Sequence, residues 1–206
     1  MYTSLASISE TLRRFLHDGM LADVGPGGLA GFFSGGTMAV SLHTPQEMAT
    51  LPLQGLSVWL YRVVRDEARL NDPPIVRPLP GGRVEIVQSP LPLRLHYLVT
   101  PMSDDSPDTE QRILGRVLQL LHSMPILTGA TLRGDLAGTD SEVHTRLEAL
   151  SLDEIARVWE ALEGSYQLSV SYEVSLAYID SVADPLSGTP VESARADWAL
   201  IVGQEA

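Results

Sequence analysis

Residues 92–127, PLRLHYLVTPMSDDSPDTEQRILGRVLQLLHSMPIL, join an alternating apolar stretch to a long helical pattern through an acidic turn. A period of two predicts a half-buried strand, and apolar residues three and four apart predict an amphipathic helix. Ser106 suits the N-cap of that helix, and Pro107 suits its first position. A strand that leads into such a helix requires a fold in which helices pack on a sheet.

Similar patterns along the chain predict an α/β (α+β) fold. The stretch at 56–66 is apolar on both faces, so we expect a central strand that is covered on both sides. Residues 24–37, with six glycines and a proline, and the turn-rich residues 71–82 are predicted to be loops. Further helices are predicted at 4–18, ending at Gly19, and at 151–162, and further strands at 37–45, 83–88, 129–136, 141–150 and 166–179.

Charge and composition exclude several function classes. The net charge of −12 opposes a broad contact with a phosphate backbone, so we expect no nucleic acid partner. All 14 basic residues are arginine, which excludes a P-loop lysine, a Schiff base and a lysine general base. The chain has no cysteine, so disulfides, thiol nucleophiles and cysteine metal sites are also excluded.

No motif predicts catalytic residues, cofactor-binding residues or metal ligands. The glycine-rich stretch follows a helix and lacks the spacing of a phosphate-binding loop. The acidic turn lacks the alternating carboxylates of a calcium loop. No two histidines lie three or four residues apart, and no serine lies in a G-x-S-x-G turn. A site assembled through space stays open as an alternative.

Some apolar residues are hard to place in the core of a single subunit, and a partner surface is one place for them. The candidate interface set combines them with three residues of the acidic turn: Phe32, Phe33, Asp104, Asp105, Asp108, Trp198, Leu200 and Ile201. The tail at 182–206 begins with prolines and ends in an apolar run that is too short for its own core. It is expected to pack on a sheet edge or groove, either of its own subunit or of a neighbour. Gly115, inside a predicted helix, is expected to let that helix approach the sheet closely.

Neither a membrane span nor a secretory signal is predicted. No apolar run approaches the roughly 18 residues of a transmembrane helix. The start MYTSLASISETLRRFLHDG has no cationic segment before an apolar block. We therefore expect a soluble, cytoplasmic protein without membrane insertion.

The order and spacing of four stretches carry a family resemblance. They are LSVWLYRVVRDEARLND, residues 91–127, LSLDEIARVWEAL and YQLSVSYEVSLAYID. Their most specific motifs are LHYLVTP, the ILG of the predicted helix, LHSMPIL and LSVSYEVS. Over about residues 4–181 the chain resembles the cap or tail-terminator family of contractile injection systems. These are phage-tail-like particles related to the antifeeding prophage.

The resemblance implies a structural subunit without catalytic residues or cofactors. Its partners would be its own copies in a ring, expected to be hexameric, the end of the inner tube and the last sheath layer. The implied fold is a single tail-terminator-like domain at 1–181, with a mixed, mostly antiparallel sheet packed by about three helices, followed by a C-terminal arm at 182–206. Two alternatives remain: a baseplate or sheath-associated adaptor of the same particle, and a small-molecule enzyme.

Overall fold

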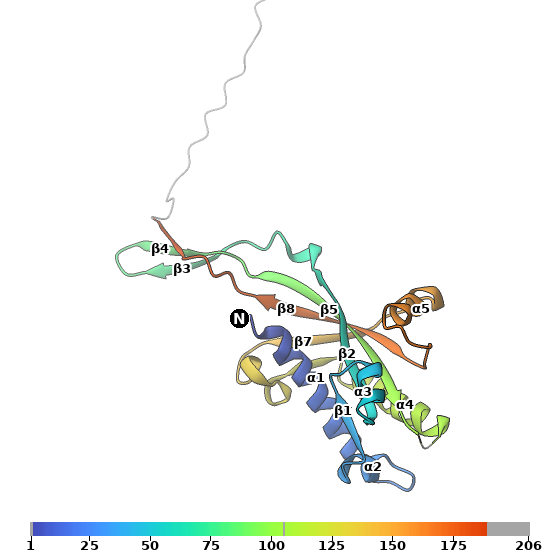
Figure 1. Ribbon diagram of the computed structural model, residues 1–206. Helices are drawn as coiled ribbons and strands as arrows, with labels where there is room; N and C mark the ends of the chain where they lie inside the picture. The colour runs from blue at the N-terminus through green and yellow to red at the C-terminus, as the bar shows by residue number, and fades with distance from the viewer. Residues whose placement is uncertain (1, 105, 189–206) are drawn as a thin grey trace, which may run out of the picture. The chain divides into compact units, whose positions relative to one another are not determined.

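The computed structural model describes residues 2–104 and 106–188 (Figure 1). These residues form two compact units. Among the described residues, the first unit comprises 2–71 together with 90–104 and 106–180, and the second comprises 72–89 together with 181–188. The boundary after residue 181 that the sequence suggests stays a prediction.

The first unit is built on a six-stranded sheet. The strand order is β1-β2-β5-β8-β7-β6, and only β1 and β2 pair in parallel. This confirms the expected mixed, mostly antiparallel sheet. Its strands are β1 (Met38–Ser41), β2 (Gln54–Arg65), β5 (Leu91–Met102), β6 (Ile126–Thr128), β7 (Glu142–Leu147) and β8 (Val170–Ile179).

In the part of the chain that the structure describes, five α-helices accompany this sheet, and side-chain caps fix where three of them begin. Ser106 Oγ accepts a hydrogen bond from the backbone of Thr109, as the sequence predicts. Ser151 and Glu154 form a capping box at the start of the last helix, which is also as predicted. The helices are α1 (Ser4–Leu21), α2 (Ala30–Ser34), α3 (Pro45–Thr50), α4 (Pro107–Ser123) and α5 (Leu152–Ala161), and short 3-10 turns lie at Glu67–Arg69, Gly129–Thr131 and Gly134–Leu136.

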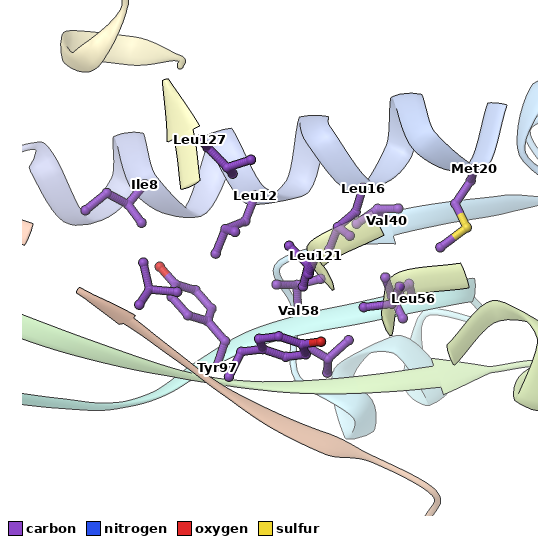
Figure 2. Packing of buried hydrophobic residues seen from close by; sticks show 14 of the residues in the cluster. Ile8, Leu12, Leu16, Met20, Val40, Leu56, Val58, Tyr97, Leu121 and Leu127 are labelled. Carbon is purple, nitrogen blue, oxygen red and sulfur yellow. The ribbon is translucent and has the colours of Figure 1, made fainter. Parts of the chain in front are cut away.

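The main core lies between one face of the sheet and α1. Apolar residues four apart along α1 point toward the sheet, where they pack in one cluster with Val58 and Tyr97 (Figure 2). The buried residues that Figure 2 labels are Ile8, Leu12, Leu16, Met20, Val40, Leu56, Val58, Tyr97, Leu121 and Leu127. Tyr97 is fully buried, and its hydroxyl lies 2.8 Å from Ser9 Oγ, so the one polar atom of this ring has a partner.

A second apolar cluster covers the opposite face of the sheet. Ile155 and Trp159 of α5 pack there on Leu98, with Trp59 and Tyr61 of β2 partly buried beside them. Because β2 contributes to both clusters, the predicted covering of this strand on two faces is confirmed. Near its C-terminal end β2 is no longer covered on both faces, and Val63 there is 43% exposed.

Two glycines inside helices behave differently from the prediction. The helix α1 does not end at Gly19 but continues to Leu21. At Gly19 the helix instead meets α4, because a Cβ there would lie 2.3 Å from Leu120 Cδ1. The prediction that Gly115 allows close approach to the sheet is wrong, since a Cβ at this position would meet no atom within 4 Å.

Three segments differ from their predicted structure. The predicted glycine-rich loop contains α2. Residues 129–136 form two 3-10 turns, and the strand that pairs with β7 is the preceding segment, Ile126–Thr128. The turn-rich residues 71–82 contain a strand, Ile75–Leu79. The strand at Ile75–Leu79 forms a local hairpin with Arg83–Val87, whereas Phe33 of α2 is buried in a core most of whose other members are distant in the sequence.

The second unit contains a small antiparallel sheet of three strands. They are β3 (Ile75–Leu79), β4 (Arg83–Val87) and β9 (Leu186–Gly188), with β4 in the centre. The turn between β3 and β4 uses Gly81 and Gly82, whose φ angles are 84° and 74°, a region that favours glycine.

Candidate assembly interface

A polar cluster lies on the sheet face that α5 covers. His96 Nδ1 lies 3.0 Å from Glu148 Oε1, and Ser171 Oγ donates a hydrogen bond to Glu148 Oε2 at 2.5 Å. Tyr61 OH lies 3.0 Å from the same Ser171 Oγ. His96 and Ser171 are 6% and 2% exposed, so the cluster is largely shielded from water.

Ion pairs continue this cluster along the sheet. Arg94 Nη2 lies 2.6 Å from Asp66 Oδ1, and Arg94 Nη1 lies 3.7 Å from Glu173 Oε2. Arg146 Nη2 lies 3.2 Å from the same Glu173 oxygen. The hydrogen bond from Arg94 lowers the pKa of Asp66 against the opposing effect of burial. Burial raises the pKa of the Tyr61 hydroxyl.

Three residues of the cluster have the chemistry of metal ligands. His96, Glu148 and Glu173 each present one ligand atom, and these atoms lie within 4.8 Å of one another. However, Arg94 and Arg146 already neutralise Glu173, and a divalent cation would be repelled by both guanidinium groups. The arrangement therefore fits an ion-pair network that stabilises the sheet better than it fits a metal site.

Sequence reasoning did not find this cluster. Its members come from separate strands and from the segment after β7, and no local spacing links them. One signal was present, because Arg94 and His96 alternate with apolar residues on a strand that otherwise looks suited to burial.

The structure places the two phenylalanines of the candidate interface set in α2. Phe33 is 3% exposed and belongs to the main core, and Phe32 packs against that core as a partly buried residue. Phe33 therefore needs no partner protein in order to be buried. Phe33 belongs to the candidate interface set because a loop is predicted there. The structure shows a short helix instead, which packs on the core.

Two acidic residues of the set lie near the start of α4. Asp104 accepts a hydrogen bond from Gln54 Nε2 at 3.0 Å. The side chain of Asp108 is 78% exposed and lies 3.9 Å from Arg112. The other members, Asp105, Trp198, Leu200 and Ile201, lie outside the described residues. An interface role for the set stays a prediction.

The sequence did not predict an apolar groove that lies between α4 and the β7–β8 end of the sheet. The groove has a volume of about 790 Å³. We call it the α4–β7 groove and define it by the residues Leu118, Leu121, Pro125, Leu147 and Tyr172. Large apolar side chains are exposed there and on both sides of Pro125 in the chain: Met124 is 43%, Ile126 42% and Leu147 51% exposed. Exposed apolar surface of this kind marks candidate protein contacts.

The fold is similar to the folds of two solved structures. The chain is similar to the sheath/tube terminator of an extracellular contractile injection system, PVC, in its extended state, with a TM-score of 0.58, 17% identity and 95% of this chain covered. It is also similar to the tube-terminating cap of the anti-feeding prophage, with a TM-score of 0.57, 17% identity and 90% coverage. The chain spans 65% and 59% of the lengths of these two chains.

Three further results complete this description. None of the curated proteins matches the chain. Among the helices that the structure describes, none has the length and apolar character needed to cross a membrane. The model of the Pvc16 N-terminal domain matches residues 7–193, and the chain therefore belongs to the Pvc16 N-terminal domain family.

Proposed function

We propose that the protein is a structural cap, or tail terminator, of a contractile injection system. The observation that carries this proposal is the match to the Pvc16 N-terminal domain over residues 7–193. It is supported by a fold shared over nearly the whole chain with two proteins that are described as a sheath/tube terminator and a tube-terminating cap. In this proposal the protein assembles in the cytoplasm and becomes part of the particle.

Capping works through complementary surfaces. The end of a growing tube presents a ring of unsatisfied subunit contacts. A terminator ring satisfies these contacts on one face, and its other face does not accept another tube layer. Elongation then stops without any chemical step, so this function requires no catalytic group and no cofactor.

A closed ring also requires contacts between copies of the cap, and we propose a homohexamer. The net charge of −12 makes close approach of two copies unfavourable unless the contact surface has little charge. The α4–β7 groove comes close to this requirement, because five of its nine lining residues are apolar and its one arginine, Arg146, is paired with Glu173. In this proposal one face of the ring binds the inner tube protein and the rim contacts the last layer of sheath protein.

Deleting the gene in its native host tests the proposal. Without the terminator, particles should have tubes and sheaths of irregular length, or should not survive isolation. A plasmid copy of the gene should restore uniform length. Particles of unchanged length and stability after deletion would contradict the proposed function.

Electron microscopy of particles that carry a labelled copy separates the cap from an adaptor. The label should lie at the end of the tube distal to the baseplate. A label at the baseplate, or along the sheath, would assign the protein to the adaptor role instead.

A further inference from the structure

The small sheet of the second unit has two different faces. Residues directly opposite each other in an antiparallel pair share a face, and successive residues of a strand alternate between faces. The pairs Val76–Ile86, Pro78–Val84 and Ile86–Leu186 therefore lie together on one face. We call this the apolar face and define it by Val76, Pro78, Val84, Ile86 and Leu186.

The opposite face is polar at its centre. Arg77 pairs with Glu85 at 3.7 Å, and Arg83 donates a hydrogen bond to Ser187. None of the residues that define the apolar face is charged. The opposite face also carries Ile75, Leu79 and Val87, but every charged side chain of the three strands lies on it, so the apolar face is the side that we expect to be packed.

Among the described residues of the second unit, none covers the apolar face. Val76 is 56% exposed and Leu186 is 71% exposed. A Cβ on Gly188, which pairs with Val84, would meet no atom within 4 Å, so the space above this part of the face is open. An isolated three-stranded sheet needs a covered apolar face to be stable.

The size of the apolar face indicates what can cover it. Three strands spaced about 4.8 Å apart, each five residues long or shorter, give a footprint of about 200–250 Å². A stable interface with a folded partner needs roughly 800 Å² per side. The face is therefore too small for a globular partner alone, and it matches a single short apolar segment.

The chain itself contains such a segment. Its outer strand β9 ends at Gly188, and the sequence continues for nine residues (189–197) before reaching the uncharged run Trp198–Gly203, WALIVG. Nine residues can span up to about 30 Å, whereas the small sheet is only about 14 Å wide. The segment can therefore reach any point of the apolar face from the edge strand to which it is tethered.

We propose that Trp198–Val202 packs on the apolar face of the small sheet in the same copy of the chain. The tether keeps the segment at an effective concentration of about 1 mM, well above that of any other copy in dilute solution. The segment completes a small core that the three strands lack. This proposal concerns the isolated chain and does not depend on the cap function.

Cysteine cross-linking tests the proposal directly, because the natural chain has no cysteine. The test variant carries Ile86→Cys and Leu200→Cys. The matched control carries Glu85→Cys and Leu200→Cys, so its strand cysteine lies one residue away on the opposite face. Disulfide formation requires the two Cβ atoms to come within about 4.5 Å. At micromolar concentration the test variant should form an intrachain disulfide about ten-fold faster than the control.

The outcomes are distinct. Equal rates in the two variants, or no disulfide in either, would overturn the proposal. A disulfide between chains, formed in a mixture of the two single-cysteine proteins at the same rate as the intrachain bond, would show that another copy supplies the segment, which also overturns it. Circular dichroism spectra that match the natural protein verify that both variants are folded.

A second measurement does not depend on cross-linking. In protein labelled with 5-fluorotryptophan, the ¹⁹F signal of Trp198 is assigned by its loss in Trp198→Phe. Ile86→Ser should shift this signal and leave those of Trp59 and Trp159 in place. Arg77→Ser, on the opposite face, should shift none of them. A Trp198 signal whose chemical shift is unchanged in Ile86→Ser would contradict the proposed packing.

Discussion

Gly19 of α1 lies directly against Leu120 of α4. A Cβ on Gly19 would lie 2.3 Å from Leu120 Cδ1 and 2.8 Å from Cδ2. The contact is reinforced by Arg116, whose Nη2 donates a hydrogen bond to the carbonyl oxygen of Gly19 at 3.0 Å. The missing side chain at this position lets the two helices pack closely.

Gly19→Ala should therefore gain less stability than helix propensity alone would give. Alanine gains about 1 kcal/mol in helix propensity, but overpacking a tight contact costs about 1–3 kcal/mol, and the cost lies at the lower end here because the partly buried Leu120 side chain can shift. We expect the free energy of unfolding in urea denaturation to change by less than about 0.5 kcal/mol. Gly115→Ala is the matched control, because its Cβ meets open space, and it should gain about 1 kcal/mol. An equal gain in both variants would refute this explanation.

The buried pair of Tyr97 and Ser9 predicts an asymmetric double-mutant cycle. Ser9→Ala leaves the buried Tyr97 hydroxyl without this partner and should cost about 1–3 kcal/mol. Tyr97→Phe should cost less, since Ser9 Oγ still donates to the Leu5 carbonyl oxygen at 3.0 Å. The double variant should cost less than the sum of the two single variants. Strict additivity in thermal or urea denaturation would mean that the two hydroxyls do not interact.

The ion pair of Asp66 and Arg94 predicts a loss of stability in acid. Arg94 holds the pKa of Asp66 below its ordinary value of 3.8. The Asp66 charge therefore contributes its full stability above that pH, and the contribution is lost as pH falls below it. Asp66→Asn should lower the free energy of unfolding by about 1–2 kcal/mol at pH 7. The loss is limited because Arg94 still pairs with Glu173 and is partly exposed to solvent.

Denaturation midpoints between pH 7 and pH 2.5 check this prediction. The gap between the natural protein and Asp66→Asn should narrow as pH falls below about 3.8. Asp108→Asn is the control, because its side chain is 78% exposed and lies 3.9 Å from Arg112. It should cost less than Asp66→Asn, because it removes only one exposed charge from the first turn of α4. A constant gap for Asp66→Asn would contradict the assigned cause.

Local patterns predicted those parts of the fold that local contacts determine. The strand at 91–101 follows from alternation, and α5 begins where Ser151 and Glu154 form a capping box. The interior glycines show where such reasoning stops. Gly19 and Gly115 look alike in sequence, yet one lies against Leu120 and the other faces open space. The difference depends on which helix packs beside each glycine, and no local signal contains that information.

The candidate surfaces also differ in how far local sequence reveals them. The apolar run at the end of the tail could be identified from its own residues, because it is too short to form a core by itself. The α4–β7 groove could not, since Leu118 and Leu147 meet there only after β6 and β7 have joined the sheet. The sequence predicts a strand at 129–136, but β7 pairs with Ile126–Thr128, and Pro125, which precedes that strand, lines the groove.

The α4–β7 groove predicts a variant that folds but does not assemble. Leu147 is 51% exposed, so Leu147→Glu should change the free energy of unfolding by no more than about 0.5 kcal/mol. Placed in an apolar contact between copies, the same charge should weaken ring formation about ten-fold or more. Native mass spectrometry measures the ring as a discrete multiple of 22.3 kDa. Leu152→Glu is the control, because Leu152 is 69% exposed at the start of α5 and lies outside the groove. Rings that form normally with Leu147→Glu would exclude the groove as the contact between copies, and equal loss with both variants would show that the effect is not specific to the groove.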